Sequence, residues 1–139
     1  MLIKDVMSSP PTTCHRGTRL SEAARLMARE NCGCLLVVND AGHLAGLITD
    51  RDLALTLASQ AAAATLSVAH AMTAAVETCQ PDTPVDDLRV VMTERRIRHV
   101  PVVTDGRLTG IISIGDVVKS SLDQLQFERD QLDSYLHQT

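Results

Sequence analysis

The chain contains the same unit twice, and this repeat is the strongest constraint on its fold. Residues 7–53 align with residues 72–117 with a single insertion, Ala41, and 13 of the 46 aligned pairs are identical. A repeat of this length is one supersecondary unit, and two copies can bury each other's apolar faces. We therefore expect two half-domains that fold together, rather than two domains that fold separately.

Each copy is predicted to fold in the order strand, helix, strand, strand, helix. The first helix is expected to follow an N-cap at Thr18 or Thr83, with Pro84 at the first helical position in the second copy. Apolar residues then recur at helical spacing. The predicted buried faces are Leu20, Ala23, Ala24 and Met27 in the first copy, and Val85, Leu88 and Met92 in the second.

Two short runs rich in β-branched residues follow in each copy and predict a hairpin. The runs are 35–38 and 44–48 in the first copy, and 100–103 and 108–112 in the second. Turn residues separate them, at 39–42 and at Asp105-Gly106. The predicted fold class is α+β (α/β), with each copy a small β-sheet packed with two helices.

The repeat divides the chain into four segments. They are copy 1 at 1–60, a linker at 61–69, copy 2 at 70–121 and an amphipathic C-terminal helix at 122–139. On that helix four leucines share one face, which Arg129 interrupts. The pattern allows packing on the helix's own domain, which we favour, or a dimer contact. The four leucines are Leu122, Leu125, Leu132 and Leu136.

Composition narrows the classes of partner. The net charge of −4 gives no electrostatic basis for binding nucleic acid, and aromatic residues make up only 1% of the chain, too few for base stacking. No apolar run approaches the ~20 residues of a membrane span. The first five residues also lack the apolar region of a signal peptide. We expect a cytoplasmic protein that binds neither nucleic acid nor membrane.

One segment whose residues could bind a ligand occurs in both copies, at 46–52 and at 110–116. Its pattern is Gly, two apolar residues, Thr or Ser, two further residues and Asp, at the point where a strand ends and a helix begins. The hydroxyl and the N–H groups of the first helical turn can bind phosphate. The carboxylate can accept both hydrogens of a ribose diol. The same residues also form a helix N-cap with an acidic third residue, and this alternative stays open.

The duplicated pattern resembles a tandem pair of CBS domains, or Bateman module, in the layout of small bacterial proteins that contain little else. The resemblance rests on these two segments, on residues 5–7 and 71–73, and on the run Arg98-His99-Val100-Pro101-Val102-Val103. It implies that the two copies pack through their sheets about a pseudo-twofold axis. It further implies two clefts that bind adenosine nucleotides, and a homodimer.

The resemblance also implies which residues bind the nucleotide. Asp52 and Asp116 would hold ribose hydroxyls, Thr49 and Ser113 would meet phosphate, and backbone at 11–13 and 76–78 would line the base. The expected site residues are Thr13, Thr49, Arg51, Asp52, Val76, Thr78, Arg98, His99, Pro101, Ser113 and Asp116. Copy 1 carries Gly33, Cys34 and Leu36 where copy 2 carries Arg98, His99 and Pro101. We therefore expect unequal clefts, unless Arg51 compensates.

The predicted function is a regulatory, adenosine-nucleotide-sensing module that signals through an unknown effector protein or a dimer rearrangement. Few basic residues favour few phosphates, so AMP is the first choice of ligand, with ADP, ATP, NAD and S-adenosylmethionine as alternatives. No cofactor, metal or catalysis is expected, although Asp50 and Asp52 form a close carboxylate pair. Two alternatives remain. One is a ligand-independent interaction scaffold, and the other is a redox or metal sensor built on Cys14, Cys32, Cys34 and Cys79.

Overall fold

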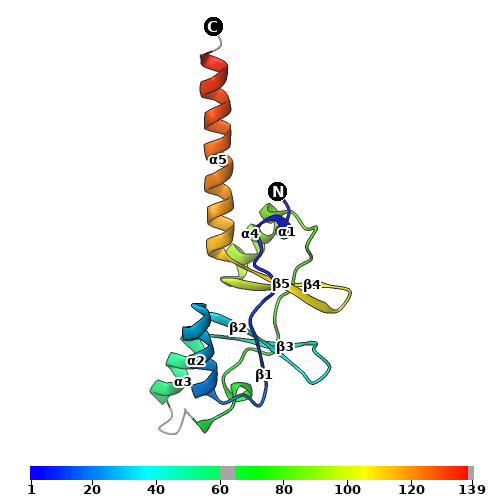
Figure 1. Ribbon diagram of the computed structural model, residues 1–139, viewed down its shortest axis with the longest axis vertical. Coiled ribbons are helices and arrows are strands. Elements are labelled where there is room, and N and C mark those ends of the chain that lie inside the picture. The colour runs from blue at the N-terminus through cyan, green and yellow to red at the C-terminus, as the bar shows by residue number, and fades with distance from the viewer. Residues whose placement is uncertain (60–64, 138–139) are drawn as a thin grey trace.

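The computed structural model describes residues 1–59 and 65–137 and shows two similar halves with one long helix extending from them (Figure 1). Part of the predicted linker, 61–64, and the last two residues lie outside the described residues. The predicted boundaries of the four segments stay a prediction.

The order of elements follows the predicted repeat. The first half contains β1 (Thr13–His15), α2 (Leu20–Glu30), β2 (Cys34–Val38), β3 (Leu44–Thr49) and α3 (Asp50–Ser59). The second contains α4 (Val85–Arg95), β4 (His99–Thr104), β5 (Arg107–Ser113) and α5 (Ile114–Leu136). Two short helical segments lead into the halves, α1 (Ile3–Val6) and the 3₁₀ helix η2 (Val68–His70). The expected α+β fold class is confirmed.

Each half has an antiparallel hairpin flanked by a parallel neighbour. In the first half β1 pairs in parallel with β2, which pairs antiparallel with β3. In the second half β4 pairs with β5, and a single parallel bridge from Cys79 to Val102 takes the place of β1. The predicted turns require left-handed backbone, with φ of 81° at Gly42, 50° at Asp105 and 79° at Gly106. Glycine adopts this region without steric cost, which explains the turn residues.

The first helix of each half begins one residue later than predicted. Arg19 and Pro84 occupy the N-cap positions in extended conformation, and neither side chain caps. Thr18 was predicted to cap α2, but its hydroxyl accepts the His15 N–H inside the preceding turn. The predicted buried faces are confirmed with one exception, because Ala24 is exposed.

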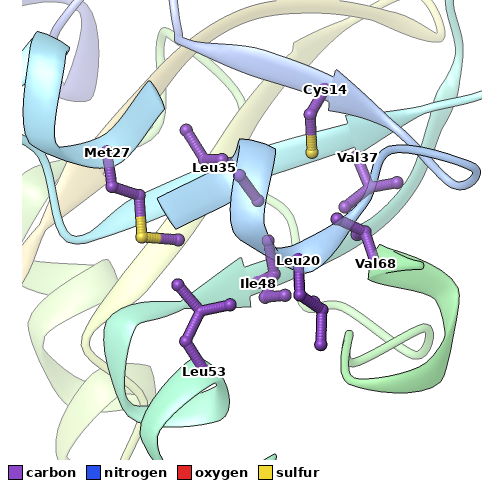
Figure 2. Close-up of a cluster of buried hydrophobic side chains, with 9 residues drawn as sticks. Cys14, Leu20, Met27, Leu35, Val37, Ile48, Leu53 and Val68 are labelled. Carbon is purple, nitrogen blue, oxygen red and sulfur yellow. The ribbon is translucent and has the colours of Figure 1, made fainter. Parts of the chain in front are cut away.

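Each core includes a residue from the segment that precedes the other copy of the repeat. The core of the first half contains Leu35, Ile48 and also Val68, which precedes the second copy in sequence (Figure 2). The core of the second half contains Val100 and also Ile3 from the N-terminus. The segments reach these places through backbone hydrogen bonds, which join 2–4 to 81–84 and 66–69 to 16–20. Neither copy of the repeat therefore completes its core with the segment that precedes it in sequence.

Gly46 and Gly110 allow these segments to cross the hairpins. A Cβ atom on Gly46 would lie 2.7 Å from the carbonyl oxygen of Thr73, and one on Gly110 would lie 2.9 Å from that of Ser8. The crossing segments form backbone hydrogen bonds with the residues that follow these glycines, Leu47 and Ile111. The glycines of the duplicated motif therefore admit another backbone.

The C-terminal helix corrects a prediction. We favoured packing of its leucine face on its own domain, but every residue from Leu122 to His137 is exposed. Only the first turns of α5 are anchored, by Val117 and Ser120, which are buried. The rest of α5 extends away from both halves (Figure 1). No helix of the described chain is both long enough and apolar enough to cross a membrane.

Candidate functional site

Two clefts lie between the halves, each lined by residues from both copies of the repeat. The Thr49 cleft has a volume of about 250 Å³, and its lining is Leu47, Thr49, Arg51, Asp52, Thr73, Ala75, Val76, Glu77, Arg96, Ile97, Arg98 and His99. The Ser113 cleft has a volume of about 390 Å³, and its lining is Ser8, Pro10, Pro11, Thr12, Glu30, Asn31, Cys32, Gly33, Cys34, His99, Ile111, Ser113 and Asp116. The two linings correspond residue by residue under the repeat alignment at most positions.

A reciprocal capping pair forms one wall of each cleft. The Thr49 hydroxyl accepts the Asp52 N–H at 3.2 Å, and Oδ2 of Asp52 accepts the Thr49 N–H at 2.9 Å. Ser113 and Asp116 form the same pair, at 3.1 and 2.9 Å. The capping interpretation of this motif is therefore confirmed. Capping uses one carboxylate oxygen of each Asp, and Oδ1 has no hydrogen-bond partner within the described chain, so a ribose hydroxyl can still bind there.

Arginines concentrate in the Thr49 cleft. Arg51 lies in the first turn of α3, Arg96 is the left-handed C-cap of α4, and Arg98 precedes β4. The cleft also contains two carboxylates, but Glu77 already pairs with Arg95 at 2.8 Å. Guanidinium groups suit phosphate because they donate several hydrogen bonds in a fixed plane. This cleft therefore offers cations for a phosphate beside a carboxylate for a ribose.

The Ser113 cleft has the opposite charge. Its lining includes Asp116 and Glu30, which pairs with Arg29 at 3.5 Å, and within the described chain the lining includes no lysine or arginine. The position equivalent to Arg98 is Gly33, and the position equivalent to Arg51 is Gly115. We considered that Arg51 might compensate for the cations missing from copy 1. The structure places Arg51 in the same cleft as Arg98 instead, which enlarges the difference between the clefts.

His99 lines both clefts and separates them. Its pKa is lowered, first by burial and then by the adjacent Arg98, while Asp50 and Asp116 act in the opposite direction. The imidazole is therefore neutral at pH 7. A phosphate bound nearby would favour the protonated ring, so His99 can respond to the charge of a ligand.

The structure gathers most of the predicted site residues but not all of them. Six lie in the Thr49 cleft, and Ser113 and Asp116 lie in the other cleft with His99 shared. Thr13 is exposed on β1, Thr78 belongs to a separate hollow beside α4, and Pro101 is buried inside β4. The six are Thr49, Arg51, Asp52, Val76, Arg98 and His99.

Sequence reasoning missed some of the lining. Arg96 and Glu30 are absent from the expected site residues, yet Arg96 lines the Thr49 cleft and Glu30 lines the Ser113 cleft. The repeat alignment held a usable signal, because Arg96 aligns with Asn31 and both end a helix in left-handed conformation, with φ of 55° and 50°. Residues just after such a helix end lead directly into β2 or β4 and so reach the cleft.

Three of the four cysteines, Cys14, Cys34 and Cys79, are poor candidates for redox chemistry. Burial raises the pKa of the Cys34 thiol to about 12, with smaller contributions from neighbouring groups, and raises the pKa of Cys14 and of Cys79 to about 11. The reactive thiolate is therefore scarce at neutral pH. Among the described residues no three His, Cys, Asp or Glu side chains form a group that could hold a metal ion.

The fold has two similar halves with paired clefts between them, and comparison with known families gives its class. The family model described as CBS domain matches residues 3–59 and residues 68–123. The chain therefore belongs to the CBS-domain family and contains a tandem CBS pair. The expected resemblance is confirmed.

Relatives of two kinds share this sequence. The chain is 31% identical over 120 residues to the CBS domain-containing protein YhcV of Bacillus subtilis, covering 86% of this chain and 85% of YhcV. It is 36% identical over 117 residues to the L-aspartate semialdehyde sulfurtransferase of Methanocaldococcus jannaschii, covering 84% of this chain but only 22% of that enzyme. The module thus occurs both as a small stand-alone protein without a catalytic domain and within an enzyme.

Solved structures share the fold. The CBS-domain containing protein ATU1752 from Agrobacterium tumefaciens is 38% identical, with a TM-score of 0.81, and the match covers 87% of this chain and 99% of that one. The CBS domain pair of protein MJ0100, solved in complex with 5′-methylthioadenosine and S-adenosyl-L-methionine, is 34% identical, with a TM-score of 0.82 and coverage of 89% and 98%. A similar CBS pair therefore binds adenosyl ligands.

Proposed function

We propose that this chain is a regulatory module that senses an adenosine nucleotide in the Thr49 cleft, with AMP as the first candidate. The observation that carries the proposal is the meeting of Arg51, Arg96 and Arg98 with Asp52 in one cleft. The guanidinium groups would bind phosphate, and the free carboxylate oxygen of Asp52 would bind ribose hydroxyls. Val76 and Ile97 would contact the base, in a cleft whose described lining contains no Phe, Tyr or Trp side chain.

The charge of the cleft favours AMP over S-adenosylmethionine. A phosphate gains from three nearby arginines, whereas the positive sulfonium of S-adenosylmethionine is repelled by them. A volume of about 250 Å³ lies just below the ~300–1,000 Å³ of most ligand pockets, which favours a mononucleotide over NAD. ADP and ATP remain alternatives, because the cleft is open to solvent and a longer phosphate chain can extend outward.

Output from the module would go through another protein or through a second copy of this chain. Apolar side chains are exposed on helices of both halves, at Leu55 and Leu57 on α3 and at Val90 on α4. Exposed apolar groups on packed helices support a protein contact at these faces. We accordingly include a homodimer in the proposal, with nucleotide binding changing the relation of its halves or its affinity for an effector.

Isothermal titration with AMP, ADP, ATP, NAD, S-adenosylmethionine and adenosine tests the proposal. We expect AMP to bind at one site per chain with micromolar affinity and adenosine to bind at least ~10-fold more weakly, because the arginines act only on phosphate. Absence of binding by all six compounds would contradict nucleotide sensing. The chain would then be better described as a ligand-independent interaction scaffold.

A further inference from the structure

The exposed part of α5 has the pattern of a helix that pairs with another helix. From Leu122 to Leu136 it extends about 21 Å at ~1.5 Å per residue. A stretch of this length is marginal as an isolated helix in water, so it gains stability from packing. We infer that α5 pairs antiparallel with α5 of a second copy of this chain. The inference rests on the homodimer of the proposed function, but not on nucleotide binding.

One valine and four leucines of α5 form a seam along one face of the helix, which Arg129 interrupts at its centre. At 100° per residue they fall within a narrow arc that continues to Val118, which is exposed although the helix there is anchored to the body. The buried anchors Val117 and Ser120 point to a different side of the helix. The seam alternates the two core positions of a heptad repeat, and its residues are Val118, Leu122, Leu125, Arg129, Leu132 and Leu136.

Charge decides which way the second helix runs. In a parallel pair Arg129 would meet Arg129 of the partner subunit inside the seam, and Glu128 would flank Asp133 of the partner subunit. Both contacts join like charges, which disfavours the parallel arrangement.

An antiparallel pair centred near residue 127 removes both of these contacts. Leu122 then lies opposite Leu132 of the partner subunit. Glu128 faces Glu128 of the partner subunit at the centre, but an Arg129 lies beside each of them, so the centre holds two cations and two anions. At the flanks Lys119 approaches Asp133 of the partner subunit. Opposite charges at flanking positions commonly set the orientation of paired helices.

The seam is tested by the mass of the full-length protein in solution without ligand. We expect wild type to have the mass of a dimer. Leu125→Asp/Leu132→Asp should have the mass of a monomer, measured by sedimentation equilibrium or light scattering. The matched control is Phe127→Asp, because Phe127 is 60% exposed, like Leu125 at 62%, but lies on the opposite face. The control should keep the wild-type mass. Circular dichroism should show that the two halves stay folded in all variants, since these side chains are not buried, while Leu125→Asp/Leu132→Asp loses some helix signal from the unpaired end of α5.

Orientation is tested by a charge reversal at Asp133. Asp133→Lys should weaken association about 10-fold in an antiparallel pair, because it faces Lys119 of the partner subunit, and Lys119→Glu in the same chain should restore it. A parallel pair predicts the opposite result for Asp133→Lys, because the new lysine would face Glu128 of the partner subunit. Asp130→Lys, directed away from the seam, is the charge-matched control and should have little effect.

Three results would overturn the inference. They are a monomeric wild type, an unchanged mass for Leu125→Asp/Leu132→Asp, and tighter association of Asp133→Lys. The second result would leave a homodimer through other helices in place. Nucleotide titration is read out separately, so failure of the seam and failure of the proposed function are distinguishable.

Discussion

The Thr49 cleft and the Ser113 cleft are built on the same backbone plan but carry different charges. Both have a reciprocal capping pair, a crossing segment admitted by a glycine and a left-handed helix end. Only the Thr49 cleft has arginines, while the Ser113 cleft has Glu30 and Asp116 among its described lining residues. These shared features belong to the scaffold that both halves need to fold. Apart from the capping pairs, the side chains that line the two clefts differ in charge.

The largest predicted effect comes from removing the cations that distinguish the Thr49 cleft. Arg51→Ala/Arg98→Ala should weaken AMP binding by at least ~100-fold, since charge-assisted hydrogen bonds contribute ~1.5–3 kcal/mol each. Adenosine binding should be almost unchanged, because it has no phosphate. Titration of both ligands checks this, with Arg107→Ala, an exposed arginine at the start of β5, as the control. Equal losses for AMP and adenosine would assign the arginines a structural role.

The second prediction tests the shared scaffold. Gly46→Ala and Gly110→Ala should each lower the free energy of unfolding by ~1–3 kcal/mol, because the new methyl groups collide with backbone at 2.7 and 2.9 Å. Gly17→Ala is the control, since nothing lies within 4 Å of its added Cβ atom. Chemical denaturation measures all three. A loss at only one of the two glycines would show that the halves do not depend equally on their crossing segments.

Much of the scaffold could be predicted from the sequence, because periodicity and turn chemistry are local. The alternation of helix and hairpin, the buried stripe of α4 and the Asp105-Gly106 turn all follow from neighbouring residues. The exchange of Ile3 and Val68 between the cores could not be predicted, because it depends on contacts between segments far apart in the chain.

The cleft was predicted less completely than the fold. The motif that contains Thr49 and Asp52 is recognisable in sequence. That Arg51 lies in one cleft with Arg96 and Arg98 can be predicted only if it is known which surfaces of the two halves meet. Pro101 was predicted at the site because it lies in a motif, yet in the structure it is buried within β4. Sequence pattern identified the motif, whereas the packing of the two halves determines which of its residues reach the cleft.

The smallest predicted effect concerns His99, which the clefts share. Its lowered pKa leaves the ring neutral at pH 7, and a bound phosphate would favour protonation. We compare the fold-loss of AMP affinity as the pH falls from about 7.5 to about 6. This loss should be about three times smaller in wild type than in His99→Gln, because in the variant only the phosphate titrates. Titrations at several pH values check this, and identical pH profiles would contradict it.

The same lowered pKa has a consequence for stability. The unfolded chain takes up a proton near pH 6.5, before the folded one does, so His99 destabilises the folded state as the pH falls below about 6.5. In His99→Gln the free energy of unfolding should therefore decrease less than in wild type as the pH falls below about 6.5. Denaturation curves for wild type and variant across this range measure it.

The most direct test of unequal clefts compares Asp52→Ala with Asp116→Ala by isothermal titration with AMP. The two substitutions remove matching capping pairs and should cost a similar ~1 kcal/mol of stability. Our account predicts that Asp52→Ala weakens AMP binding at least ~10-fold while Asp116→Ala changes it less than ~threefold. Equal weakening by both substitutions, or a greater loss in Asp116→Ala, would contradict the assignment of the Thr49 cleft as the nucleotide site.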